Sequence, residues 1–284
     1  MQNTVAVERE AEDIAKSVGI PPCPAVLTGL VGQMRNEEPD FPKIAKLIGT
    51  DVALAATMLK TVNSPFYGLP QKVSSIQQAL ALLGLRNVSH LVTRLLFQQA
   101  FPVTDGAAME RYWESSSNIA MILAWLARKT KKLDRDDAYT YGLFRDCGIP
   151  VMMLNFTDHP DLLDQAYNNP DQVLTEIEDE QLGVDHASVG AELAESWHLS
   201  TATCLAIRRH HDYTIYDKES DLPPQSFIMV SLGIVAEKLY RGHCGDTPGA
   251  EWTRAGAAAL QAAGISEEDL AEFAGEIDDV LAAG

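Results

Sequence analysis

The chain has few cysteines, and they form no recognisable motif. Its 284 residues include four, Cys23, Cys147, Cys204 and Cys244, which stand far apart and make no CxxC pair. This spacing excludes a zinc knuckle and a disulfide framework. Cysteines without a disulfide or zinc-binding pattern are typical of proteins in a reducing cytoplasm, and we expect the protein to be cytoplasmic.

Basic residues are also scarce. Lysine and arginine total 22 against 40 aspartates and glutamates, which gives a formal net charge of −18. Binding to nucleic acid or to an anionic membrane surface requires cations at the contact, so neither partner is expected. The composition favours proteins or small molecules as partners. It does not indicate an oligomeric state.

Long apolar runs and strand patterns are missing as well. No stretch reaches the roughly 18 apolar residues of a membrane span, and the polar N-terminus does not resemble a signal peptide. Hydrophobic residues still make up 46% of the chain, enough for a sizeable core. Alternating β-branched segments are absent, whereas apolar residues recur at three- and four-residue spacing, so we predict an all-α fold.

Prolines, serines and aspartates divide this helical pattern into segments. We predict helices over residues 24–34, 41–48, 51–62, 75–83, 85–101, 110–132, 135–155, 173–181, 185–197, 200–211, 225–240, 251–263 and 267–282. The cluster of Pro, Asp, Gly and small residues at 102–108 predicts a boundary between two helical modules. No internal repeat accompanies it.

The most informative stretch runs from Asn63 to Val88, NSPFYGLPQKVSSIQQALALLGLRNV. Pro65 ends the preceding helix, Ser74 or Ser75 begins the next, and Gly84 closes it. An NS-x-F-x-G loop followed by SI-x-x-A-x-x-LLG-L resembles the signature of the HDOD family of bacterial signalling domains. The resemblance extends from about residue 18 to about residue 240. It implies a relative of the HD metal-dependent phosphohydrolases in which the metal site is mostly lost.

The resemblance implies three parts for the chain. Residues 1–17 are expected to form an N-terminal extension or linker, and residues 18–105 the N-terminal HDOD helical module. Residues 106–284 are expected to form the HD-like helical bundle with a C-terminal helical addition. Such domains often accompany receiver or other sensory domains, so the chain could be the output half of a response regulator.

The same resemblance assigns a remnant HD site, position by position. In YWESSSNIA, Ser115 stands where the first ligand histidine is expected, and in GLFRDCGI, Arg145 and Asp146 replace the namesake His-Asp pair. DHASVG retains His186, and AIRRHHDY retains the pair His210 and His211. The final aspartate has no counterpart, because Gly233 and Ile234 occupy its place.

These departures argue against catalysis. Of the mononuclear ligand set only Asp146 survives, and the Arg145 guanidinium cannot donate a lone pair to a metal. One hypothesis is that Arg145 itself replaces the metal as the cation beside Asp146. Adjacent residues on a helix diverge by about 100°, so a direct pair between them is not assured. The alternative is an Arg145 side chain that points to solvent.

The retained residues leave a second possibility open. Asp146, His186, His210 and His211 resemble the second-metal ligands of binuclear HD enzymes, although two adjacent histidines can share a ligand point only at a distorted helix end. We expect no cofactor, with a divalent transition metal on these four residues as the alternative. With the resemblance, the sequence therefore predicts a non-catalytic signalling module. It would be a scaffold that binds signalling proteins, or a small-molecule or nucleotide ligand. The alternative function is a metal-dependent phosphohydrolase acting on a nucleotide or cyclic dinucleotide.

Overall fold

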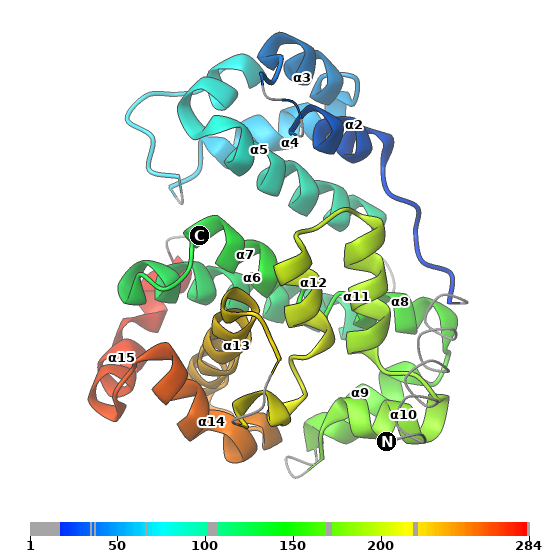
Figure 1. Ribbon diagram of the computed structural model, residues 1–284, viewed down its shortest axis with the longest axis vertical. Helices are drawn as coiled ribbons and strands as arrows, with labels where there is room; N and C mark the ends of the chain where they lie inside the picture. The colour runs from blue at the N-terminus through cyan, green and yellow to red at the C-terminus, as the bar shows by residue number, and fades with distance from the viewer. Residues whose placement is uncertain are drawn as a thin grey trace. The chain divides into compact units, whose positions relative to one another are not determined.

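The computed structural model consists of helices and connecting loops, with no strand among the residues it describes (Figure 1). It describes residues 18–34, 36, 38–65, 67–101, 107–168, 172–217 and 221–282. The predicted all-α class is confirmed over these ranges. The predicted N-terminal extension, residues 1–17, lies outside them.

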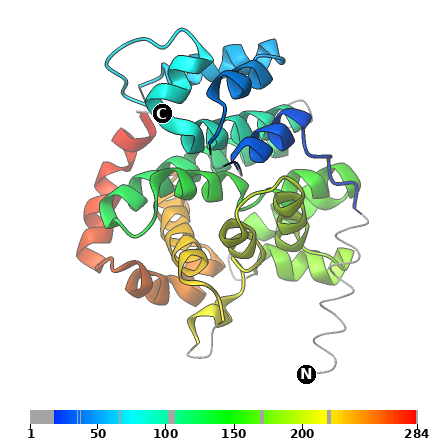
Figure 2. The same ribbon diagram turned by 45° about the horizontal axis from the view of Figure 1, so that its top comes forward.

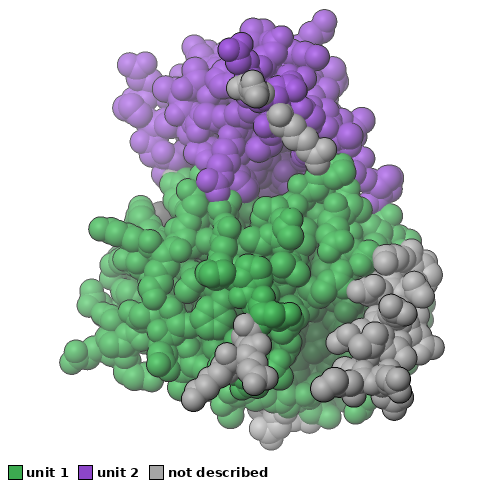
Figure 3. Space-filling model, viewed as in Figure 1, with its two compact units in different colours: residues 1–20, 103–281 green, residues 21–102, 282–284 purple. Residues whose placement is uncertain are grey.

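The chain forms two compact units (Figure 3). One unit comprises residues 21–102 with 282–284, and the other comprises residues 103–281 with 1–20. The sequence places a module boundary between residues 105 and 106, in a segment where residues 102–106 lie outside the described part of the chain. Each unit is described by itself below.

The smaller unit contains four helices among its described residues: α2 (Ala25–Met34), α3 (Phe41–Ile48), α4 (Val52–Val62) and α5 (Ile76–Ala100). The caps predicted at Asp51 and Ser75 are present, since each side chain accepts a hydrogen bond from a backbone N–H in the first turn, and Asp40 caps α3 in the same way. Helices α2, α3 and α4 all pack against α5. Their shared core contains Leu30, Ile44 and Leu54.

The loop between α4 and α5 is held by one side chain. The Asn63 amide donates to the carbonyls of Leu59 (2.7 Å) and Val73 (2.8 Å), and its oxygen accepts from the Val73 N–H (2.8 Å). Asn63 therefore ties the end of α4 to the segment that begins α5. The NS-x-F-x-G motif thus has a structural role in closing this corner.

Helix α5 is bent at Gly84, whose φ of 80° and ψ of 165° lie outside the helical region. Only glycine adopts this conformation readily, so the predicted helix stop is a real interruption, although a second helical segment follows directly. Among the described helices α5 is the one long and apolar enough for a membrane span by length and composition. Half of that apolar window is buried inside the fold, as in a core helix.

Replacing Gly68 with valine is expected to lower the free energy of unfolding by about 1 kcal/mol or more, because Gly68 has a φ of 57°. Thermal or denaturant unfolding measures the loss. Gly32→Ala is the matched control: this glycine lies within α2 with no atom near its missing Cβ, so alanine there should be neutral or stabilising. An unchanged stability for Gly68→Val with a specific loss of partner binding would instead identify the loop as a recognition surface.

The larger unit carries the remaining helices. They are α6 (Ala107–Thr130), α7 (Arg135–Phe144), α8 (Gly148–Asn155), α9 (His159–Asn168), α10 (Leu174–Leu182), α11 (His186–Ser196), α12 (Thr201–Arg208), the 3-10 turn η1 (Tyr213–Tyr216), α13 (Pro224–His243), α14 (Ala250–Ala263) and α15 (Glu267–Ala282). Helix α13 packs against α6, α12 and α14, and α11 packs against α8 and α12 (Figure 2). Residues 122–127, at the centre of α6, are all buried.

Two predicted helices in this unit have wrong boundaries, and one helix was missed. The single helix expected over residues 135–155 is two helices, α7 and α8, separated by a turn at residues 145–147. The helix expected to run to residue 211 ends at Arg208. Helix α9 was not predicted at all, although Pro160 stands in its first turn, where proline is well accommodated. The first two differences shape the site described next.

Candidate functional site

Arg145 and Asp146 lie in the turn between α7 and α8. Pro150 explains the break, because a proline has no N–H to bond the carbonyl four residues earlier and its ring clashes with that carbonyl. The carbonyl in question belongs to Asp146, which instead accepts from the Ile149 N–H at 2.9 Å. Outside a regular helix, two adjacent side chains can both turn towards the same centre, and here they do.

Gly148 allows α8 to approach the start of α11 closely. A Cβ atom at Gly148 would lie 1.9 Å from the His186 carbonyl oxygen and 2.8 Å from the Gly190 nitrogen, so no larger residue fits without a shift of the backbone. Asp185 caps α11 by accepting from the Ser188 N–H, which makes His186 the first helical residue. The glycine contact thus brings His186 beside Asp146.

His210 and His211 lie in the turn that follows α12. Because the helix ends at Arg208, the two adjacent rings are no longer 100° apart on a helical surface, and their centroids are only 3.9 Å from each other. Both rings face His186, at centroid distances of 5.5 and 5.0 Å. The structure therefore meets the condition that the sequence analysis set for two adjacent histidines to share one ligand point.

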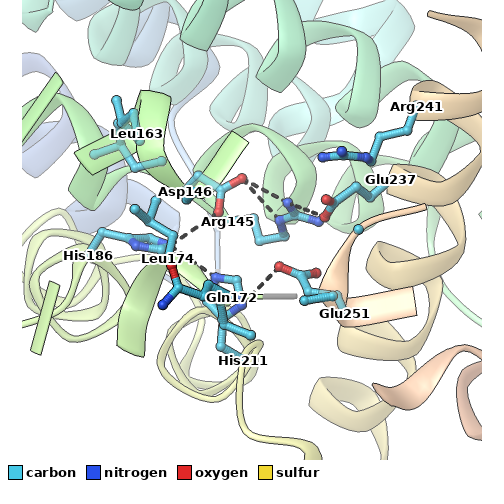
Figure 4. A pocket seen from close by; sticks show the side chains of 15 residues that line it. Arg145, Asp146, Leu163, Gln172, Leu174, His186, His211, Glu237, Arg241 and Glu251 are labelled. Carbon is cyan, nitrogen blue, oxygen red and sulfur yellow. Dashed lines mark hydrogen bonds and ion pairs between the residues drawn. The ribbon is translucent and has the colours of Figure 1, made fainter. Parts of the chain in front are cut away.

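Asp146 stands at the centre of this cluster (Figure 4). Its Oδ1 lies 3.1 Å from His210 Nε2 and 3.5 Å from His186 Nε2. His186 Nε2 in turn lies 3.1 Å from His211 Nε2. Of the six predicted site residues, the structure thus joins Asp146 and the three histidines directly, while Ser115 lines an adjoining cavity.

Arg145 is buried and paired, contrary to the solvent-facing alternative. Its Nε and one terminal nitrogen lie 3.1 and 3.0 Å from Asp146 Oδ2, and that terminal nitrogen is also 2.9 Å from Glu237 Oε2. The side chain is only 6% exposed. The guanidinium therefore lies between two carboxylates on the side of Asp146 away from the histidines (Figure 4).

The residues present do not fit a metal at the mononuclear HD position. Ser115 and Arg145 replace two histidine ligands, and the place of the last aspartate holds Gly233, whose carbonyl lies 3.5 Å from Arg145. A Cβ at Gly233 would also lie 3.2 Å from the Tyr141 ring, which leaves little room for a larger side chain. A cationic guanidinium, that of Arg145, lies beside Asp146 instead.

Three carboxylates of the site were missed by the sequence analysis: Glu178 on α10, Glu237 on α13 and Glu251 on α14. Glu178 had a signal in the helical spacing. It lies four residues from both Leu174 and Leu182, on the apolar face of α10, where it is fully buried. Glu237 had another, because it lies one turn beyond Gly233 on the same face of α13. Glu251 had none, since an acidic residue in a first turn is ordinary.

Asp146, His186, His210 and His211 do fit a metal ion. Their ligand atoms all lie within 4.8 Å of one another, and ligands about 2.0–2.2 Å from a tetrahedral ion such as zinc are separated by about 3.3–3.6 Å. Each ring also has its other nitrogen next to an oxygen. His186 Nδ1 is 2.6 Å from Glu178, His210 Nδ1 is 2.6 Å from the Ile207 carbonyl, and His211 Nδ1 is 2.9 Å from Glu251.

Those Nδ1 contacts decide which nitrogen faces the centre. In His186 and His210 a carboxylate or carbonyl oxygen accepts the Nδ1–H, and in His211 the Glu251 carboxylate lies beside Nδ1, so the Nε2 lone pair of each neutral ring is left for the cluster. Without a proton or a metal ion between them, the His186 and His211 lone pairs would face each other at 3.1 Å. A bound cation removes this repulsion.

The net charge of the surroundings supports a cation as well. Four carboxylates, those of Asp146, Glu178, Glu237 and Glu251, are each less than one fifth exposed, and the Arg145 guanidinium is paired with two of them, Asp146 and Glu237. Buried negative charge is costly unless a positive group compensates it. A proton on His186, a proton on Glu237 beside Glu251, or a metal ion at the four ligands reduces this excess of negative charge.

The pKa values of the site follow from burial and from these neighbours. Burial, together with neighbouring imidazoles, lowers the pKa of His210 and of His211 to about 4, so both rings are in the neutral form that binds metals. Burial opposes the charge on His186 too, but Glu178 and Asp146 outweigh it and raise its pKa well above the usual value. Burial and Glu251 raise the pKa of Glu237 to about 7.

A cavity of about 690 Å³ adjoins the cluster on the Arg145 side. Its polar lining includes Ser115, Arg111, Glu114 and Tyr112. A smaller cavity of about 200 Å³ reaches His186, His211 and Glu251. Both are bordered by Arg145, Asp146 and Glu237, so the ion-pair network forms the wall that they share.

Solved structures share this fold. A candidate phosphohydrolase from Shewanella amazonensis SB2B has a TM-score of 0.70 at 21% identity, covering 96% of this chain and 93% of its own. A candidate signal-transduction protein from Marinobacter aquaeolei VT8 has a TM-score of 0.71 at 21% identity, covering 95% of this chain and 60% of its own. At such identities the likeness shows the fold alone.

Sequence comparisons match most of the chain. An uncharacterised protein of Treponema pallidum (strain Nichols) is 26% identical over 221 residues, which span 73% of this chain and 42% of that protein. The model of the HDOD domain matches residues 20–213, a range that contains the Asn63 corner, the Arg145–Asp146 turn and the three histidines. The chain therefore belongs to the HDOD domain family, as the motif around Asn63 predicted.

Proposed function

We propose that this chain is a non-catalytic module of bacterial signal transduction that acts as a scaffold for a protein or small-molecule partner. One observation carries the proposal: the Arg145 guanidinium, at the position where the family resemblance expects a ligand histidine, is buried between Asp146 and Glu237, at 3.0 and 2.9 Å. A guanidinium neutralises carboxylates but cannot coordinate water or lower its pKa as a metal does. The ion pairs of Arg145 can thus stabilise the helical bundle without supplying the metal-bound water that hydrolysis would need.

We also propose that the four-ligand cluster holds a single divalent transition-metal ion. The sequence alone led to the expectation of no cofactor, but the three inward Nε2 atoms and the excess of carboxylates favour one. Asp146, His186, His210 and His211 would hold it, and imidazole-rich sets with one carboxylate suit zinc or iron. Its contribution would be to link α8, α11 and the end of α12.

The alternative is a phosphohydrolase that uses this single ion. The cavity of about 690 Å³ favours it, because a volume of this size accommodates a nucleotide-sized ligand. Against it, Glu237 and Glu251 stand in the wall next to the ligand cluster and would repel a phosphate. Hydrolysis by two metal ions is disfavoured more strongly. The second ion would need a ligand histidine at the position where this chain has Arg145.

Metal content and turnover test the proposal together. Protein reconstituted with Zn²⁺ and passed over a desalting column should retain about one equivalent by elemental analysis, and His186→Ala should lose it. His198→Asn is the matched control, because this histidine is exposed and lies outside the cluster. The loaded protein should not hydrolyse nucleotides or cyclic dinucleotides. Turnover that disappears with His186→Ala would reverse the functional assignment, and retention of no metal would remove the proposed ion.

A further inference from the structure

Glu251 brings the C-terminal part of the chain into the candidate metal cluster. It lies in the first turn of α14, beyond residues 20–213 that match the HDOD model. Its side chain is 14% exposed, and its Oε1 lies 2.9 Å from His211 Nδ1 (Figure 4). Gly249 and Ala250, which precede it, line the smaller cavity with it. The start of α14 is therefore one wall of the site.

The carboxylate determines which His211 nitrogen carries the proton. His211 Nδ1 makes no hydrogen bond with Glu251 despite the distance of 2.9 Å, so the main effect of the carboxylate is electrostatic. A negative charge beside Nδ1 favours the tautomer protonated there, which leaves the Nε2 lone pair towards His186 and Asp146. The attraction strengthens when an ion on Nε2 draws electron density from the ring.

Helix α14 is held in place by contacts that do not involve His211. It packs on α13 with Ala255 and Ala259 buried, and its Arg254 pairs with Glu176 on α10. Near its other end, Lys132 Nζ donates to the Ala262 carbonyl at 2.8 Å. The Glu251 carboxylate is thus delivered by a docked helix and needs no rearrangement to meet the histidine.

We infer that Glu251 is a positioning residue for the ion, orienting His211 through its Nδ1 and making α14 a part of the metal centre. This inference rests on the proposed single-ion site. It follows that ion affinity depends on a residue outside the matched family segment. By reciprocity, the bound ion also holds the first turn of α14 more firmly against the turn after α12.

The test is a Co²⁺ titration of the full chain, followed by the visible absorption of the bound ion, which reports both affinity and ligand geometry. Glu251→Ala should weaken binding by about 10–100-fold, the usual effect of removing an outer partner of a ligating histidine. Glu251→Gln should weaken binding nearly as much, because the amide keeps the shape of the side chain but removes the negative charge beside Nδ1. Glu176→Ala is the control, because it removes the exposed ion pair between α14 and α10 without touching a histidine.

Each outcome has a defined meaning. Equal Co²⁺ affinity for the wild type and Glu251→Ala overturns the positioning role and leaves the single-ion site standing. An equal loss in Glu176→Ala also overturns it, because general docking of α14 would then explain the effect. A wild-type chain that binds no Co²⁺ and no Zn²⁺ refutes the single-ion site, and the positioning role with it.

Discussion

Replacing Arg145 with alanine is expected to lower the free energy of unfolding by about 3–5 kcal/mol, the usual cost of removing one partner of a buried ion pair. Arg145 is 6% exposed, and Asp146 and Glu237 are 16% and 18% exposed, so water cannot take its place fully. The measurement is denaturant unfolding in the presence of a chelator, which keeps any bound metal from masking the loss.

A double-mutant cycle with Asp146→Asn isolates the pair itself. A substantial coupling energy is expected if Arg145 is the cation that compensates Asp146. Arg111→Ala is the matched control: its pair with Asp164 is about 60% exposed on both sides, and such pairs contribute no more than about 1 kcal/mol. A coupling energy near zero for Arg145 and Asp146 would show that Arg145 merely blocks metal binding by not being histidine.

Replacing Glu178 with alanine is the second change with a large expected effect. Its two oxygens lie 2.6 Å from His159 Nε2 and 2.6 Å from His186 Nδ1, and one of them also accepts the His186 N–H at 2.9 Å. All three side chains are at most 1% exposed. Alanine would leave two buried imidazoles and the first N–H of α11 without an acceptor, and we expect a loss of about 3–5 kcal/mol.

Denaturant unfolding under the same conditions measures this loss. Glu178→Gln should fall between alanine and the wild type, because the amide oxygen accepts from one histidine while the amide NH₂ opposes the other. Glu180→Ala is the control, since this exposed residue of the same helix should change stability by less than about 0.5 kcal/mol. A loss below about 1 kcal/mol for Glu178→Ala would contradict a structural role for the His159, Glu178 and His186 contacts.

Much of the fold could be predicted because its signals are local. Asp51 and Ser75 accept hydrogen bonds from N–H groups three residues ahead, as capping requires, and both helix starts were placed correctly. Gly68 and Gly84 take positive φ, the first in the expected turn and the second at the expected helix stop. A cap or a turn depends on a few neighbouring residues, so the order of residues is sufficient to reveal it.

The sequence identified several residues of the site, but it did not predict how they are arranged. Arg145, Asp146 and the three histidines stood at recognisable motif positions, yet periodicity continued helices through residues 145–147 and 209–211, where the structure has turns. Pro150 was the local signal for the break between α7 and α8, because proline cannot donate to the carbonyl four residues earlier. These turns allow adjacent side chains to converge on one centre, which regular helices would not permit.

The sequence by itself determined the all-α class, the caps, the Asn63 corner and the replacement of histidine by Arg145. Only the tertiary structure decided that Arg145 is buried between Asp146 and Glu237, and that Glu178 and Glu251 hold the histidines from outside. The physical reason is the range of the interactions. Caps and turns act over three or four residues, whereas Arg145 and Glu237 are 92 positions apart and meet only when α7 and α13 pack together.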